Sequence, residues 1–288
     1  MAEVLRGKPA ADALADEVRG RAEALAAQGV APRLAIVRVG ERADDLAYER
    51  NAVRRCEGLG IAAEVRALPA GCTQQDAAAA LQAVNADASI HGCLLLRPLP
   101  AHLDEAALCA LLDPAKDVDG ITEGSLYGVF AGAARGFAPC TAESCLRLLD
   151  YYGVPLEGAR VTVVGRSLVI GRPVAALLLG RHATVTVAHS RTADVAAACR
   201  GADIVIAAAG QARLLGADCA APGQYIVDVG MNWDEGAGGF VGDVDFDAVE
   251  PLAAAITPVP GGVGALTTAV LALHTVQAAE RIAASGAE

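Results

Sequence analysis

The segment Val161–Pro173, VTVVGRSLVIGRP, constrains the fold of this chain more than any other. A strand-like run of four residues leads into Gly165, Ser167 follows two residues later, and Gly171 precedes a stretch with helical spacing of apolar residues. This order predicts a buried strand, a tight turn and the start of a helix. The free N–H groups and positive dipole end of such a helix can bind a phosphate. Because the spacing departs from the common G-x-G-x-x-G pattern, an ordinary strand-to-helix turn explains these residues equally well.

Strand-like segments alternate with helical patterns along the rest of the chain. The expected strands are Leu34–Val39, Ala62–Arg66, Ile90–Leu96, Val161–Val164, Thr184–Ala188, Asp203–Ala208 and Tyr225–Val229. The expected helices are Pro9–Ala27, Ala43–Gly58, Thr73–Val84 and a long final one. The alternation predicts an α/β protein with parallel sheets, whose functional groups lie beyond the carboxyl ends of the strands. A polar turn at Asp113–Gly120 and a glycine- and alanine-rich loop up to Ala138 indicate a boundary between two domains.

Composition narrows the classes of function. The chain has 288 residues, 54% hydrophobic and 20% charged, as in a globular protein with a sizeable core. A net charge of −11 without a basic stripe argues against nucleic acid as the main partner. Eight dispersed cysteines, none in a C-x-x-C pair, favour free thiols in a reducing compartment over a metal site or disulfides. The N-terminus lacks a signal-peptide core and polar residues interrupt Val263–Ala284, so we expect a cytoplasmic protein without membrane spans.

The nature of the cofactor follows from the strand after the first motif. In NAD-binding folds the second strand of the unit ends in an acid that bonds the ribose hydroxyls. Here Thr184–Ala188 is followed by His189–Thr192, which contains no acid. Arginine and hydroxyl groups at this place suit a ribose that carries a phosphate, so we expect NADP, although Arg191 alone fits a solvated surface charge as well. The expected cofactor-binding residues are Gly165, Arg166, Ser167, Ile170, Gly171, Ser190, Arg191 and Thr192.

Five motifs occur in an order that is typical of one family. They are KDVDG at 116–120, PCT at 139–141, GRSLVIGRP at 165–173, GDVDF at 242–246 and PVPGGVG at 258–264. Over essentially the whole chain they resemble the methylenetetrahydrofolate dehydrogenase/methenyltetrahydrofolate cyclohydrolase family (FolD type). The resemblance implies a homodimer of one-carbon metabolism with two α/β domains and a folate cleft between them. Residues 1–139 with the C-terminal helix 265–288 would form the folate or catalytic domain, and 140–264 a Rossmann-type NADP-binding domain.

The chain departs from the family at the catalytic positions. The family motif after the first strand reads G-x-x-x-x-S-x-x-Y-x-x-x-K; here Tyr48 is retained, Asp45 stands at the serine and Ala52 at the catalytic lysine. The third strand of the family leads into G-x-L-x-Q-x-P-L-P, and Leu96 stands at the glutamine that partners the lysine. Asp119 of KDVDG is retained, and the resemblance implies that it bonds the amino and ring nitrogens of the pterin.

The resemblance assigns the remaining site residues in the same way. Tyr48, which packs against the pterin, and Asp119 are the expected catalytic residues. Ala265 stands where a proline usually follows the PVPGGVG loop. No metal is expected. The expected substrate-binding residues, for a tetrahydrofolate derivative, are Asp45, Tyr48, Leu96, Pro98, Asp119, Pro260, Gly261 and Gly262.

Chemistry indicates which of the two family activities suffers from these departures. Oxidation of the methylene bridge is a hydride transfer to the nicotinamide, which needs mainly that donor and acceptor are held close. Hydrolysis of the methenyl ring needs an activated water and a protonated ring nitrogen, which a lysine can supply and Ala52 cannot. A positioned acid–base group is worth about a hundred- to ten-thousand-fold in rate. We therefore predict an NADP-dependent dehydrogenase with weak or lost cyclohydrolase activity.

Several alternatives stay open from the sequence. Asp45 is either the N-cap of the helix from Ala43 or a new acid–base or substrate contact. Arg55 could fix a charge, but arginine does not deprotonate and cannot serve as a base. The full bifunctional activity would persist if Asp45 or a water relay replaced the lysine. The chain could also be a repurposed paralogue with another substrate, or a folate-binding protein without catalysis.

Overall fold

The computed structural model describes residues 2–236 and 238–285. The chain forms two compact units, which we name after their sheets. The three-stranded unit comprises Ala13–Cys140 and the residues from Thr268 on, and the six-stranded unit comprises the residues up to Asp12 and Thr141–Thr267. The first residues group with the six-stranded unit because β1 (Glu3–Val4) pairs in parallel with β11 (Ala255–Ile256).

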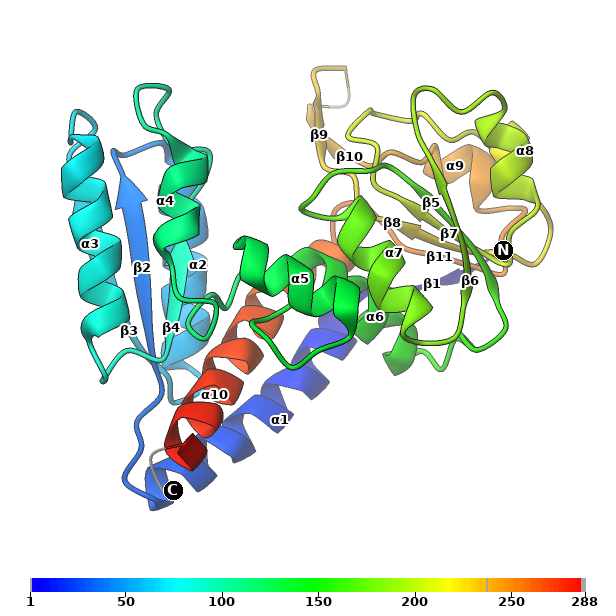
Figure 1. Cartoon of the computed structure of the whole chain (residues 1–288). Coiled ribbons are helices and arrows are strands. Elements are labelled where there is room, and N and C mark those ends of the chain that lie inside the picture. The colour runs from blue at the N-terminus through cyan, green and yellow to red at the C-terminus, as the bar shows by residue number, and fades with distance from the viewer. Residues whose placement is uncertain (1, 237, 286–288) are drawn as a thin grey trace. The chain divides into compact units, whose positions relative to one another are not determined.

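A parallel sheet in the order β3-β2-β4 forms the centre of the three-stranded unit (Figure 1). Its strands are β2 (Arg33–Val39), β3 (Ala62–Leu68) and β4 (Gly92–Leu95). Its first three helices after β2 are α2 (Ala43–Glu57), α3 (Gln74–Ala86) and α4 (Glu105–Leu111). Both α2 and α3 contact β2 and β3, and α4 contacts α3. The central strand β2 is therefore apolar along most of its length, with Leu34, Ala35 and Ile36 fully buried.

Capping residues determine where helices of this unit begin. Thr73 accepts a hydrogen bond from the Asp76 N–H, and the Asp76 carboxylate accepts one from the Thr73 N–H, which makes a capping box at the start of α3. Thr122 caps α5 (Glu123–Ala131), which ends at Gly132 in the left-handed conformation. The expectation of a continuous loop up to Ala138 is therefore wrong, because glycine and alanine there are compatible with a short, well-capped helix.

Two long helices, α1 (Gly7–Ala27) and α10 (Thr267–Ser285), run alongside each other (Figure 1), and most of each belongs to the three-stranded unit. The Arg21 guanidinium joins them by two hydrogen bonds to the Glu280 carboxylate, at 3.0 and 2.5 Å. Most of α10 is apolar and buried, including the whole stretch 269–273. The buried face of α10 carries one aromatic base, His274, which lies next to the KDVDG loop.

The six-stranded unit contains a parallel sheet in the order β1-β11-β8-β7-β5-β6. The strands other than β1 and β11 are β5 (Arg160–Val164), β6 (Thr184–Ala188), β7 (Ile204–Ala207) and β8 (Tyr225–Asp228). The helices are α6 (Cys140–Tyr151), α7 (Gly171–Leu179), α8 (Val195–Arg200) and α9 (Phe246–Val249), with 3-10 turns at Ala217–Cys219 and Val263–Ala265. An antiparallel hairpin of β9 (Asn232–Asp234) and β10 (Gly239–Val241) is separate from this sheet. Two parallel sheets with helices between successive strands confirm the predicted α/β class.

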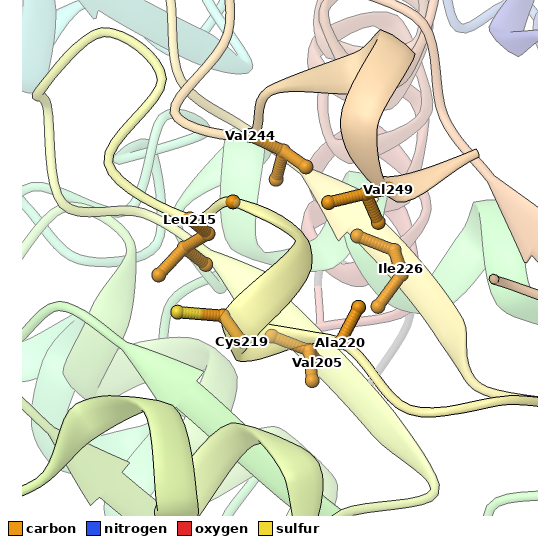
Figure 2. Close-up of a pocket in the computed structure, with 8 residues that line it drawn as sticks. Val205, Leu215, Cys219, Ala220, Ile226, Val244 and Val249 are labelled. Carbon is orange, nitrogen blue, oxygen red and sulfur yellow. The ribbon is translucent and has the colours of Figure 1, made fainter. Parts of the chain in front are cut away.

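An apolar pocket lies in the six-stranded unit, lined by side chains from β7, β8, α9 and the Ala217–Cys219 turn (Figure 2). The lining includes the Cys219 thiol but no charged group. All eight cysteines are free thiols, and burial raises the pKa of Cys56, Cys93, Cys145 and Cys199 to about 12. Within the described residues, no helix combines the length and apolarity needed to cross a membrane.

Candidate active site

The turn after β5 has the close backbone packing expected of a phosphate-binding turn. Gly165 has φ +134°, and a Cβ there would lie 2.1 Å from the Ala208 carbonyl oxygen. A Cβ on Gly171 would lie 2.3 Å from the Gly165 carbonyl oxygen. Only glycine fits either position, and the first turn of α7 can therefore approach the end of β5 directly. Ile170 occupies the N-cap without a side-chain cap.

Ser167 and the polar residues after β6 lie along the same edge of the six-stranded sheet. The Ser167 hydroxyl accepts hydrogen bonds from the N–H groups of Ile170 (3.1 Å) and Gly171 (3.4 Å). Strands β5 and β6 end side by side, since Val164 pairs with Ala188. The turn after β6 is closed by the Thr192 hydroxyl, which accepts from the His189 N–H at 2.9 Å. The side chains exposed at these two turns include those of Arg166, Ser167, Ser190 and Arg191, and also the apolar ones of Leu168 and Val169.

Two buried carboxylates that the sequence analysis did not single out fix the neighbouring loops. The Asp243 carboxylate accepts hydrogen bonds from three successive N–H groups, those of Ala209, Gly210 and Gln211, at 2.5 to 2.9 Å. Asp228 at the end of β8 accepts from the N–H groups of residues 230, 243 and 244. Burial raises the pKa of Asp228 to about 6. The GDVDF motif contains Asp243, but only the fold shows that it anchors the loop after β7, next to the Gly165 turn.

In the three-stranded unit, Tyr48 and Ala52 lie on α2, one helical turn apart. The Ala52 side chain is fully buried, whereas Tyr48 is partly exposed. Leu96 follows β4 and is also buried, with its N–H donating to the Val37 carbonyl at 2.9 Å. The two positions that the resemblance assigns to the family lysine and glutamine thus carry buried apolar side chains.

Asp45 does not cap α2, so the N-cap alternative is wrong. Arg42 occupies the N-cap, and Asp45 is the third helical residue, 6% exposed. The Arg42 guanidinium donates to the Asp45 carboxylate at 2.8 Å and to the Pro98 carbonyl at 3.0 Å. Pro98 follows a cis peptide bond with Arg97. The Arg42–Asp45 ion pair therefore connects the start of α2 with the turn after β4, and brings the predicted residues Asp45 and Pro98 together.

The chain has only two lysines, Lys8 and Lys116, and both are engaged elsewhere. The exposed Lys8 ammonium pairs with Asp12 at 2.5 Å, one turn along α1. The buried Lys116 ammonium donates to the carbonyl oxygens of Val84, Asn85 and Asp87 at the end of α3, at 2.7 to 2.9 Å. Burial lowers the pKa of Lys116.

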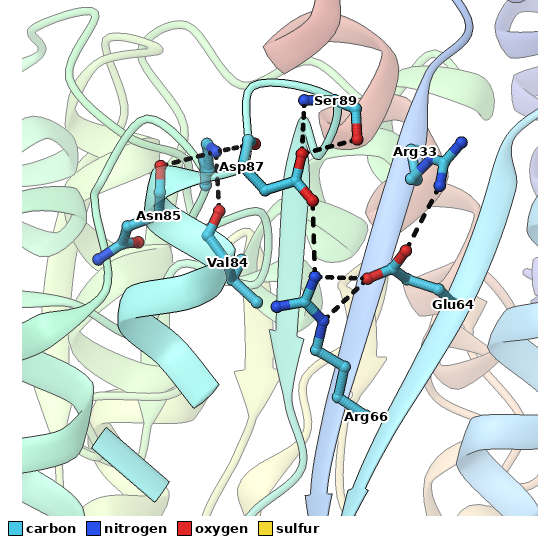
Figure 3. A network of polar contacts seen from close by, with 8 residues as sticks. Arg33, Glu64, Arg66, Val84, Asn85, Asp87 and Ser89 are labelled. Atoms are coloured by element: carbon cyan, nitrogen blue, oxygen red, sulfur yellow. Dashed lines mark hydrogen bonds and ion pairs between the residues drawn. The ribbon is translucent and has the colours of Figure 1, made fainter. Parts of the chain in front are cut away.

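A surface network surrounds the place where Lys116 caps α3. Figure 3 shows the carbonyl groups of Val84, Asn85 and Asp87 beside an ion-pair chain. In that chain Arg66 pairs with Glu64 at 2.8 Å and with Asp87 at 3.7 Å, and Arg33 pairs with Glu64 at 3.4 Å. These contacts give Lys116 and its neighbours a structural role at the C-terminal end of α3.

Asp119 is the titratable group of the KDVDG loop with the strongest pKa perturbation. Its carboxyl is partly buried, and burial and the neighbouring Asp117 raise its pKa to about 6, against the opposing effects of Arg97, the Cys140 thiol and His274. The Asp117 carboxylate accepts from the N–H groups of Ile121 (3.0 Å) and Thr122 (2.7 Å) and so anchors the loop to the start of α5. A carboxyl with this pKa can change protonation state near neutral pH.

The glycine-rich loop at Pro260–Gly262 belongs to the six-stranded unit and packs on the start of α1. The Gly7 N–H donates to the Gly261 carbonyl at 2.8 Å, and a Cβ on Gly7 would lie 2.0 Å from the Gly262 carbonyl oxygen. Gly261 has φ +99°, a conformation that favours glycine. The role of these three residues in substrate binding stays a prediction.

Comparison with known proteins gives matches along nearly the whole chain. The catalytic domain of tetrahydrofolate dehydrogenase/cyclohydrolase matches residues 5–119, and the NAD(P)-binding domain of the same enzymes matches residues 139–283. The chain belongs to the tetrahydrofolate dehydrogenase/cyclohydrolase family. It is 50% identical over 281 residues to the bifunctional protein FolD of Carboxydothermus hydrogenoformans, which covers 97% of this chain and 98% of the relative.

Solved structures of FolD enzymes have the same fold as this chain. The bifunctional enzyme of Campylobacter jejuni is 36% identical, with a TM-score of 0.94 over 98% of this chain and 99% of its own. The enzyme of Trypanosoma brucei, complexed with NADP and an inhibitor, is 34% identical, with a TM-score of 0.90 over 97% of this chain and 98% of its own. These matches confirm the predicted family and fold class, and the predicted cofactor, NADP, agrees with both the NAD(P)-binding domain and the Trypanosoma complex.

Proposed function

We propose that this protein is an NADP-dependent methylenetetrahydrofolate dehydrogenase in which the cyclohydrolase activity is weak or absent. The observation that carries the proposal is the buried Ala52 at the position of the family lysine, in a chain whose two lysines are both engaged in other contacts. The dehydrogenase half rests on family membership and on the phosphate-binding turn. The loss of hydrolysis rests on the chemistry of the substituted positions.

The six-stranded unit fits the cofactor. Gly165 and Gly171 let the turn after β5 pack against Ala208 and the start of α7 more closely than a Cβ would allow, and the N-cap residue Ile170 makes no side-chain hydrogen bond to α7. Arg166, Ser167, Ser190 and Arg191 would hold the phosphate on the ribose. When bound, the nicotinamide ring accepts the hydride from the methylene carbon of the folate. The chain's own task in this step is to hold the two reacting carbons close together.

Hydrolysis asks more of the side chains. A water must lose a proton as it attacks the methenyl carbon, and the ring nitrogen must gain one as the ring opens. Ala52 offers no ionisable group, and Leu96 replaces an amide that could orient water by an apolar side chain. Losing one positioned acid–base group lowers such a rate by about a hundred- to ten-thousand-fold. The hydride transfer does not depend on that group, so we propose that it is retained.

Restoring both family residues tests the proposal. The double substitution Ala52→Lys with Leu96→Gln should raise methenyltetrahydrofolate hydrolysis at least about tenfold, while the rate of NADPH formation changes little. Hydrolysis is followed by the disappearance of the methenyl absorbance. Ala52→Met with Leu96→Gln is the matched control, because it supplies similar bulk without an amine. Equal hydrolysis by both double variants, or rapid hydrolysis by the unchanged protein, would contradict the proposal.

A second candidate function is the complete bifunctional activity. Two observations favour it: the curated relatives are named as bifunctional proteins, and the pKa of Asp119 is raised to about 6. A carboxyl with this pKa can exchange protons with a substrate near neutral pH. In this case the unchanged protein would hydrolyse methenyltetrahydrofolate fast from the outset. The substitution Asp119→Asn would abolish that hydrolysis.

We also propose that the protein is a cytoplasmic homodimer. Buried, unoxidised thiols suit a reducing compartment. The β9–β10 hairpin carries the exposed apolar side chains of Trp233 and Phe240, and Met231 directly before it is exposed too; such side chains gather at interfaces. Light scattering on the purified protein should give about twice the chain mass of 29.1 kDa. A mass near 29.1 kDa at micromolar concentration would contradict the dimer.

A further inference from the structure

His274 on α10 is buried and makes a directional contact with the KDVDG loop. It is 1% exposed, and its Nδ1 atom lies 2.8 Å from the carbonyl oxygen of Val118. A carbonyl oxygen can only accept a hydrogen bond, so Nδ1 carries the proton and donates it. The contact joins two segments that are 156 residues apart in the sequence.

The surroundings of the imidazole leave it little freedom to turn. The Phe137 ring lies 4.9 Å from the His274 ring, centroid to centroid, at an interplanar angle of 32°. The Arg281 guanidinium lies over the Phe137 ring at 4.3 Å and donates to the Gly136 carbonyl at 2.9 Å. The Cys140 thiol donates to the same Val118 carbonyl at 3.3 Å, and its sulfur lies 3.8 Å from Nδ1 of His274. The Val118 carbonyl therefore has two donors that come from different helices.

The Val118 carbonyl belongs to the peptide group that leads into Asp119. Fixing this carbonyl fixes the plane of the peptide and hence the backbone position from which the Asp119 side chain projects. On the N-terminal side, the Asp117 carboxylate is tied to the N–H groups of Ile121 and Thr122. Asp119 is thus held between two anchored points.

We propose that His274 is a positioning residue for Asp119, holding the Val118–Asp119 peptide from α10. The inference rests on the proposed role of Asp119 in folate binding. The charged or titratable groups that face Asp119 are Asp117 in the same loop, Arg97 after β4, Cys140 at the start of α6 and His274 on α10. Asp117 favours the protonated carboxyl, whereas Arg97, Cys140 and His274 favour the carboxylate. Loss of His274 should therefore raise the pKa of Asp119.

Kinetics of two substitutions separate positioning from packing. The substitution His274→Leu keeps the bulk of the side chain but removes the hydrogen-bond donor. We expect the KM for methylenetetrahydrofolate to rise about threefold to tenfold, which corresponds to the net free energy of one hydrogen bond. The KM for NADP should stay unchanged. In His274→Asn the amide nitrogen can take the place of Nδ1 and should restore most of the folate KM. Thr275→Val is the matched control, because this buried neighbour on α10 donates only within its own helix, to the Leu271 carbonyl.

A measurement without folate keeps the inference separate from the proposed function. The carboxyl carbon of Asp119, assigned with Asp119→Asn, is followed by NMR during a pH titration of the ligand-free protein. We expect its midpoint to lie at higher pH in His274→Leu than in the unchanged protein and in Thr275→Val. An unchanged midpoint, or a His274→Asn variant with the same folate KM as His274→Leu, would overturn the inference. If the unchanged protein neither binds nor oxidises methylenetetrahydrofolate while the NMR midpoint moves as expected, the proposed function fails and the coupling between His274 and Asp119 stands.

Discussion

At the scale of single residues, we propose that the charge of Asp119 governs folate binding in the three-stranded unit. Burial and the neighbouring Asp117 together raise the pKa of the Asp119 carboxyl to about 6. The pterin amino group and ring N–H are donors, so the expected contact needs the carboxylate form. Lys116 in the same motif has a different task, since it is held by three carbonyl oxygens at the end of α3.

The raised pKa of Asp119 predicts a pH dependence of folate use. Above pH 6 the carboxyl is ionised and accepts from the pterin; below pH 6 it is protonated and this acceptance is lost. The value of kcat/KM for methylenetetrahydrofolate should therefore fall as the pH is lowered through about 6, approaching tenfold per pH unit well below it. Initial rates between pH 5 and 8 measure this. The Asp119→Asn variant should have a low value without this acid limb; a flat profile for the unchanged protein would refute the assignment.

At the scale of elements, the start of α2 is tied to the turn after β4 by one arginine. Arg42 donates to Asp45 within its own helix and to Pro98 across the turn. Asp45 is almost fully buried, whereas the Arg42 side chain is 45% exposed. The ion pair with Asp45 stabilises the fold only weakly. The bond to Pro98 fixes the turn after β4, which also carries Leu96.

Removing this arginine should affect the site more than the stability. For Arg42→Met we expect a loss of less than about 1 kcal/mol in the free energy of unfolding, because a half-exposed ion pair contributes little. The KM for methylenetetrahydrofolate should rise several-fold, since the turn after β4 loses its anchor. Urea denaturation and initial rates measure the two effects. Arg54→Met, on the same helix but bonded to Asn51, is the control that should change neither quantity; an unchanged KM in Arg42→Met would show that the anchor is dispensable.

At the scale of the whole molecule, the residues that we propose for the cofactor and for the folate lie in different units. The turn at 165–171, which we propose binds the cofactor phosphate, and the loops fixed by Asp228 and Asp243 belong to the six-stranded unit. Tyr48, Ala52, Leu96 and Asp119 belong to the three-stranded unit. A ligand that binds one unit should therefore stabilise the two units unequally.

Hydrogen exchange with NADP alone tests this division. We expect slower exchange at 165–171, 189–192 and 208–211 in the six-stranded unit, and little change along β3 and α3 of the three-stranded unit. Amide exchange is measured by mass spectrometry with and without saturating NADP. Equal protection of both units, or stronger protection of the three-stranded unit, would contradict the assignment of the cofactor domain.

Local sequence patterns predicted most helices and strands well, but they predicted contacts between residues far apart in the sequence poorly. Apolar periodicity predicted β6 at its observed bounds and α2 and β5 to within one residue, because burial of one face determines both pattern and structure. The helix α5 was missed because it depends on its caps, Thr122 at the start and Gly132 at the end, rather than on a long apolar pattern. The anchoring roles of Asp243 and His274 depend on partners 32 or more residues away, so no local spacing indicates them.

The central claim is that hydride transfer survives where hydrolysis has been lost, and a single progress curve tests it most directly. The purified protein is mixed with methylenetetrahydrofolate and NADP, and NADPH, methenyltetrahydrofolate and formyltetrahydrofolate are quantified together over time, against a buffer control for spontaneous hydrolysis. The account predicts that methenyltetrahydrofolate accumulates in step with NADPH and then decays no faster than in buffer. Formyltetrahydrofolate that appears in step with NADPH, without accumulation of the methenyl compound, would contradict it.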